Sequence, residues 1–178
     1  MKKIHSVIVF AILFCAAACA DSGGRNSAAG NSNSMAGAPS NSDRGQAVLQ
    51  VEGGTVSVEY GRPALSGRDL EKLISPGQEW RMGSNAATTL TTDVDLKFGD
   101  KVIPGGKYVL KAKAVDPQNW YLLVDTENQT RVAEIPLSLQ KVDRQTELMT
   151  INLVKKGSGG TFVLDWGNLS LSTDFEKA

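Results

Sequence analysis

Short runs of alternating apolar and polar residues, separated by turn-forming residues, are the feature that most constrains the fold of this chain. The clearest runs cover residues 56–60, 108–114 and 162–166. A period of two places every second side chain on one face, which is the pattern of a half-buried β-strand. Gly99-Asp100 and the Pro-Gly-Gly sequence at 104–106 stand between such runs, and both favour tight turns.

About eight such segments follow one another at short spacing, and no long segment has the 3.6-residue period of a helix. We expect one helical turn over residues 69–74, ended by Pro76-Gly77. The pattern predicts an all-β domain, built as an antiparallel β-sandwich or jelly roll of about eight strands with one short helical turn. A closed β-barrel is the alternative architecture.

The first 18 residues have the organisation of a secretory signal peptide. Two lysines follow the initial methionine, residues 4–14 are mostly apolar, and small residues at 16–18 precede Cys19. A small residue directly before a cysteine resembles the lipobox of bacterial lipoproteins, although Ala16 stands where leucine is usual. We therefore expect residues 1–18 to be removed and Cys19 to be lipidated. Ordinary signal cleavage beside Cys19, followed by secretion without a lipid, is the alternative.

The segment after Cys19 predicts a tether to the membrane. Residues 19–46 are rich in Ser, Asn, Gly and Ala and have no hydrophobic period, so we expect them to be disordered. A single domain is expected over residues 47–176. Several acyl chains on Cys19 would anchor the chain stably in the cell envelope. The residue after Cys19 is Ala20 rather than aspartate, which favours the outer membrane, on its periplasmic or surface side.

Removal of the signal also limits the chemistry of the mature chain. The one histidine, His5, and the first of two cysteines lie in the signal, and Cys19 would carry lipid. This excludes Cys or His nucleophiles, a Ser-His-Asp triad and a Cys/His zinc site. A formal net charge of zero offers no basic surface to nucleic acid. Acidic turn residues such as Asp93 and Asp95 match no complete calcium loop, so we expect neither a metal nor a cofactor.

Polar and aromatic residues concentrate between the first clear strand and residue 92. The candidates for ligand binding are Tyr60, Arg62, Arg68, Trp80, Arg81, Asn85 and Thr88. Arginine offers a planar fork of donors to carboxylate or phosphate, the hydroxyl and amide groups add hydrogen bonds, and tryptophan adds a flat face. Such a set suits a small anionic, peptide or sugar ligand. The same side chains could instead brace their loops by donating to backbone carbonyls.

Three pieces of this sequence resemble a known family. They are the Tyr-Gly-Arg-Pro sequence at 60–63, the Trp-Arg-Met-Gly-Ser-Asn sequence at 80–85 and the turn at 104–108. Together they are similar to domain-of-unknown-function family 2911, which consists largely of exported bacterial proteins. The resemblance covers residues 56–171 and implies a β-rich fold without an established activity. The family commonly has glutamate where this chain has Ala86, and its segment after residues 120–125 is longer. An acid-dependent activity at that glutamate would be absent here.

These observations leave three classes of function. A non-catalytic ligand-binding module in the envelope would use the arginine-rich region described above. A structural or assembly lipoprotein would bind an envelope protein partner through a surface patch or an edge strand. A hydrolase or lyase would need a carboxylate with a raised pKa in a cleft. The missing histidine and cysteine and the alanine at position 86 favour the binding module, and we assign no catalytic residue.

Overall fold

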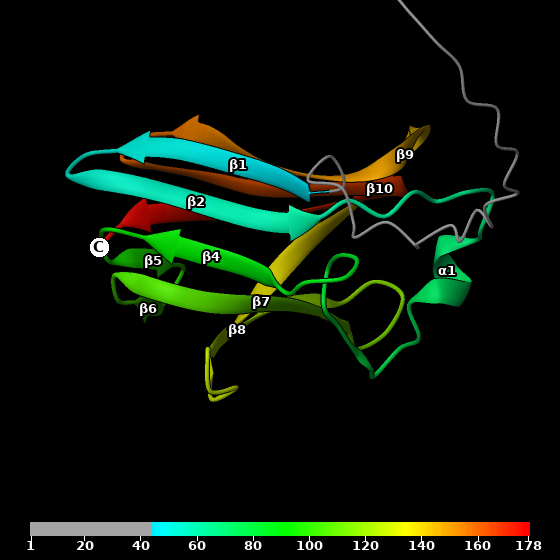
Figure 1. Ribbon diagram of the computed structural model, residues 1–178, viewed down its shortest axis with the longest axis horizontal. Coiled ribbons are helices and arrows are strands. Elements are labelled where there is room, and N and C mark those ends of the chain that lie inside the picture. Colours follow the sequence, from blue (N-terminus) through cyan, green and yellow to red (C-terminus); the bar gives the residue numbers. More distant parts are fainter. Residues whose placement is uncertain (1–43) are drawn as a thin grey trace, which may run out of the picture. The chain divides into compact units, whose positions relative to one another are not determined.

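The computed structural model describes residues 44–178, except for the side chain of Glu71. The predicted signal peptide, Cys19 and the predicted tether up to residue 43 lie outside the described residues, whereas residues 44–46 belong to the first strand. The elements are β1 (Arg44–Val51), β2 (Gly54–Gly61), α1 (Leu70–Leu73), β3 (Glu79–Trp80), β4 (Thr88–Thr92), β5 (Leu96–Phe98), β6 (Lys101–Ile103), β7 (Gly106–Ala114), β8 (Trp120–Thr126), β9 (Arg131–Lys156) and β10 (Gly159–Lys177) (Figure 1).

The prediction of an all-β antiparallel domain with one short helical turn is confirmed. Every strand pair among the described residues is antiparallel, and α1 has only four residues. Residues 44–178 contain ten strands, where the alternation predicts about eight. Very short strands, such as the two-residue β3 and the three-residue β6, contribute to the higher number. Within residues 44–178, no helix is both long and apolar enough to cross a membrane.

The strands form one continuous path in the order β1-β2-β4-β7-β8-β9-β10-β5-β6, with β3 paired to β7 beside β4. Because β1 and β6 are its two ends, the sheet is open and the alternative of a closed barrel is not formed. The long β9 changes partner along its length: residues 131–137 pair with β8, and residues 138–156 follow β10. This exchange brings β1 and β2 close to β9 and β10 (Figure 1).

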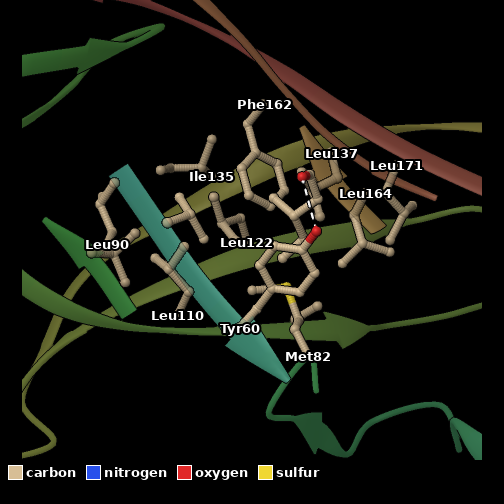
Figure 2. Packing of buried hydrophobic residues seen from close by; sticks show 14 of the residues in the cluster. Tyr60, Met82, Leu90, Leu110, Leu122, Ile135, Leu137, Phe162, Leu164 and Leu171 are labelled. Atoms are coloured by element: carbon tan, nitrogen blue, oxygen red, sulfur yellow. Dashed lines mark hydrogen bonds between the residues drawn. The ribbon is translucent and has the colours of Figure 1, made fainter. Parts of the chain in front are cut away.

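One hydrophobic cluster forms the core of the described domain. Side chains of alternate residues in β2, β4, β7, β8 and β9 point inward, and those of β10 meet them (Figure 2). The packing is close, because Leu49 of β1 fills the space that a Cβ on Gly160 of β10 would need. Residues 44–178 thus bury a core of their own, which is the requirement for a domain to fold independently.

The β9–β10 ladder has two register shifts, one on each side of Gly167, and the second positions the site described below. Lys141 pairs with Leu169, and the next pair joins Thr146 to Gly167. Residues 142–145 therefore bulge out of β9 opposite the single residue Asn168. Gly167 has a φ of 58°, a conformation that glycine adopts without the steric cost of a Cβ. Bulges of this kind re-aim side chains and are frequent beside binding sites.

Candidate functional site

Two adjoining cavities lie between α1 and this bulge. The apolar cavity has a volume of about 260 Å³ and is lined by Leu70, Ile74, Pro76, Ala114, Pro117, Trp120, Leu139, Lys141, Asn168 and Leu169. The polar cavity has a volume of about 400 Å³ and is lined by Leu65, Gly67, Arg68, Asp69, Leu70, Gln145, Glu147, Gly167 and Asn168. Leu70 and Asn168 belong to both linings, so the two cavities share a boundary.

The segment that carries α1 forms one wall of the apolar cavity. Leu70 and Ile74 are buried, and the N–H of Ile74 donates to the carbonyl of Leu70 at 3.2 Å, which closes the helical turn. The segment is then held to β7, because the N–H of Gly77 donates to the carbonyl of Ala114 at 2.7 Å. A four-residue helix cannot be stable alone, so these contacts with the sheet hold the wall in place.

Trp120 supplies the aromatic part of the wall of the apolar cavity. It begins β8, and only 7% of its surface is exposed. Its indole Nε1 is buried and has no hydrogen-bond partner among the described residues. Buried polar atoms normally have a hydrogen-bond partner, so the indole N–H of this wall is a donor that the described residues leave unpaired.

The polar cavity combines braced charges with amide side chains. Arg68 donates from Nε to the carbonyl of Leu65 at 3.0 Å and from Nη2 to the carbonyl of Ala64 at 2.6 Å. Glu147 accepts the N–H of Ser66 at 2.7 Å. These groups fix the turn around residues 64–68 on β9. Gln145 and Asn168 also line the cavity, and their amides carry both donors and acceptors.

The residues singled out in the sequence are distributed over several environments. Tyr60 is buried and donates its hydroxyl to the carbonyl of Ile151 at 3.2 Å (Figure 2). Thr88 is fully buried and donates to the carbonyl of Met82 at 2.6 Å. Trp80 stacks on a second tryptophan, Trp166, with ring centroids 5.6 Å apart. These three side chains stabilise the fold in this structure.

The first two of the three sequence pieces that resemble the family lie against each other. A Cβ on Gly61 would lie 2.1 Å from the carbonyl oxygen of Ser84, so the chain can approach only because residue 61 is glycine. Arg81 is exposed and donates to the carbonyl of Asn85 at 3.2 Å. The Nε of Arg62 is buried without a partner among the described residues. Of the seven candidates, Arg68 is the one that lines either cavity.

Sequence reasoning did not identify most of the cavity wall. Trp120, Leu139, Gln145 and Asn168 come from three separate stretches, and none stands near the arginine-rich region. One local signal was available, because Gly167-Asn168 is a turn-type dipeptide inside a strand pattern. Such a glycine marks a bulge or a close approach.

A network of ion pairs on the outer face of β7, β8 and β9 was also missed. Asp125 is only 2% exposed, and it receives hydrogen bonds from Arg131 Nε and from Lys111 Nζ, the latter at 2.9 Å. Arg131 also pairs with Glu79 at 2.7 Å and with Glu134 at 2.6 Å. The network joins β3 to β7, β8 and β9, and each charge in it has an opposite partner.

The network keeps its carboxylates ionised. Burial alone would raise the pKa of Asp125, but hydrogen bonds from Arg131 and Lys111 outweigh it and hold that pKa below its usual value. The hydrogen bond from Arg131 has the largest effect on Glu79 and lowers its pKa too. Every described carboxyl group with a shifted pKa is shifted downward; the others are Asp100, Asp116 and Asp174. A general acid at neutral pH needs the opposite shift.

The acidic turn residues are occupied by the protein's own donors. Asp93 accepts the N–H of Thr55 at 2.9 Å, and Asp95 accepts the N–H of Gly105 at 2.8 Å. Asp116 accepts two backbone N–H groups in the turn before β8. In the part of the chain that the structure describes, no three acidic, histidine or cysteine side chains are grouped as metal ligands.

Comparison with known proteins gives a family and no activity. The family model described as "Protein of unknown function (DUF2911)" matches residues 42–175. The chain therefore belongs to this family, as the motifs around Gly61 and Arg81 predict. No curated protein and no solved structure matches the chain.

Proposed function

We propose, from a family membership that assigns no activity, that this protein is a lipid-anchored envelope protein whose β domain binds a small ligand without chemical change. The binding site is the pair of cavities beside α1. The observation that carries the proposal is the apolar cavity of about 260 Å³, which adjoins a polar cavity of about 400 Å³ across Leu70 and Asn168. Ligand sites typically have volumes of roughly 300–1,000 Å³ and combine apolar walls with a few polar groups.

The chemistry of the described residues supports binding rather than catalysis. The carboxyl groups with shifted pKa values are shifted downward, and Asp125, the one that is buried, is held by two cations. Such a carboxylate is neither a general acid nor a free nucleophile. Of the seven residues suggested by the sequence, Arg68 shapes the polar cavity. Tyr60, Trp80 and Thr88 stabilise the fold instead.

The location of the protein is the second part of the proposal. The charged, apolar and small residues before Cys19 follow the order of a lipoprotein signal. Lipid on Cys19 would hold the domain at the envelope, on the outer membrane. We expect the wild-type protein to fractionate with membranes and to carry acyl chains, and the Cys19→Ala variant to be soluble. A wild-type protein that is secreted without acyl groups would contradict this part of the proposal.

A thermal-shift screen tests the binding function. Residues 43–178 are melted with sugars, amino acids, short peptides, phosphates and divalent cations. A ligand at 100 times its dissociation constant stabilises the fold by about 2.7 kcal/mol. We expect one class to raise the melting temperature of the wild type but not of Ala114→Leu, which places a larger side chain in the apolar wall. An equal rise in the melting temperature of the two proteins would show that the ligand binds outside the apolar cavity. The absence of a rise with any compound would reject the binding function.

A further inference from the structure

The apolar cavity has room for one large hydrophobic side chain. A cavity of about 150 Å³ in another protein binds benzene, and the volume here is about 260 Å³. Its wall consists mainly of aliphatic and proline residues together with Trp120, and Lys141 is the one charged residue in the lining. A branched aliphatic or aromatic group would fit this space and would supply the van der Waals contacts that the wall atoms lack when the cavity is empty.

The polar cavity next to it is suited to an uncharged group that both donates and accepts hydrogen bonds. Gln145 and Asn168 each offer an amide, which is such a group. The peptide bond has the same combination of one N–H and one carbonyl. Asn168 also lines the apolar cavity, so a peptide bond placed there lies next to a side chain in the apolar space.

An anion is a poor match for the polar cavity. Two nitrogens of Arg68 already donate to backbone carbonyls. Asp69 and Glu147 line the same cavity and would repel a carboxylate or phosphate. The site therefore lacks an available cationic fork for an anion.

A sugar is also a poor match. Sugars need a flat exposed ring or many polar groups, but Trp120 is the aromatic residue of the linings and is 7% exposed. Trp80 is more exposed, yet it stacks on Trp166 and lines neither cavity.

The bulge in β9 brings one of its residues to the site. Residues 142–145 take no part in the ladder with β10, and Gln145 at the end of the bulge lines the polar cavity. An extended peptide can pair with backbone outside a regular ladder, as in strand addition, while pockets select its side chains.

We infer that the ligand is an uncharged, extended peptide segment with one bulky apolar side chain, whose side chain fills the apolar cavity and whose adjacent peptide bond meets Gln145 and Asn168. This inference rests on the proposed binding function and narrows it. Of the anionic, peptide and sugar ligands considered from the sequence, the peptide matches the observed linings.

Nuclear magnetic resonance titration of residues 43–178 tests the inference. The probes are acetyl-Gly-Leu-Gly-amide, the matched acetyl-Gly-Glu-Gly-amide, N-acetylglucosamine, inorganic phosphate and benzene. We expect the leucine peptide to bind at least tenfold more tightly than the glutamate peptide. Benzene should bind in the apolar cavity without contact to the amides of Gln145 and Asn168. Replacing Gln145 and Asn168 by alanine should weaken the affinity for the leucine peptide about tenfold, which corresponds to the loss of one or two hydrogen bonds. The affinity for benzene should stay unchanged.

Matched controls keep the outcomes separate. The pair Gln140→Ala and Asn152→Ala changes exposed β9 amides outside the linings and should leave both affinities unchanged. If benzene binds and the leucine peptide does not, the peptide inference is overturned while the cavity remains a binding site. Preferential binding of phosphate or the sugar would likewise overturn it. If no probe binds, both the inference and the proposed function fail.

Discussion

Filling the apolar cavity from Ala114 should stabilise the protein, whereas the same change two residues earlier should destabilise it. Ala112 and Ala114 lie on the same face of β7 and are 0% and 2% exposed. Ala114 lines the apolar cavity and Ala112 lines neither cavity. The two positions thus differ mainly in the free space beside them, so they form a matched pair.

The magnitude follows from the added surface. Leucine has three more carbons than alanine, and burial of each contributes about 0.8 kcal/mol, or about 2.4 kcal/mol in all. Ordering the leucine side chain costs about 0.5–1 kcal/mol. We therefore expect Ala114→Leu to raise the free energy of unfolding by about 1–2 kcal/mol. At Ala112, where the core is packed, overpacking should lower it by about 1–3 kcal/mol.

Urea denaturation of the two variants and the wild type, followed by circular dichroism, measures both effects. The midpoints should move in opposite directions with an unchanged slope, because a change in slope would signal an altered denatured or native state. If Ala114→Leu is destabilised as much as Ala112→Leu, the space beside Ala114 does not admit a side chain, and the reasoning about the apolar cavity is refuted.

Three further changes test the rest of the account. Asp125→Asn should lower the free energy of unfolding at pH 7 by about 2–3 kcal/mol, less than for a fully buried pair because its partners are partly exposed. The folded pKa of Asp125 is depressed, so its stabilisation is present above the unfolded pKa of about 4 and is lost as the pH falls through the folded pKa. Acid titration should therefore destabilise the wild type more than this variant, with exposed Glu127→Gln as a neutral control. Tyr60→Phe should cost about 1 kcal/mol of stability, measured by urea denaturation, without weakening any ligand of the cavities. Trp80→Ala should cost about 2 kcal/mol and reduce the near-ultraviolet dichroism, because it removes the stack on Trp166; an unchanged spectrum would argue against that stack.

The strands and the core could be predicted from the sequence because their signal is local. Alternation over residues 108–114 specifies which side chains of β7 face inward, and Tyr108, Leu110, Ala112 and Ala114 are all buried as the pattern requires. Gly99 and Gly105 mark the turns at the ends of β6, where the chain reverses. Burial and turn chemistry favour the same structure at each of these positions, so the architecture follows from short stretches.

The site could not be predicted in the same way, because its residues are brought together by the pairing of strands that are distant in the sequence. Leu70 and Trp120 line one cavity only once the α1 segment is held against β7. Gln145 lines the polar cavity because the ladder shifts register between Lys141 and Thr146. No local pattern encodes that slip. The ion-pair network has the same origin, since its side chains come from β3, β7, β8 and β9 and meet through strand register.

The arginine-rich region illustrates the limit of composition. Arg62, Arg68 and Arg81 are close in sequence, yet Arg68 braces the polar cavity while Arg81 contacts the carbonyl of Asn85. Tyr60 and Thr88, two of the polar candidates, face the interior. The three arginines do lie outside the strands, but their proximity along the chain did not predict which of them share a surface.

The most direct test of the central claim, that the cavities beside α1 are the binding site, is a two-dimensional nuclear magnetic resonance titration with the leucine peptide and with benzene. The three indole signals serve as internal reporters, since Trp120 lines the apolar cavity and the stacked pair of Trp80 and Trp166 lines neither cavity. The account predicts shifts of the Trp120 indole and of residues 139–147 and 167–169. Shifts confined to the loop at 81–87, or no shifts with either probe, would contradict it.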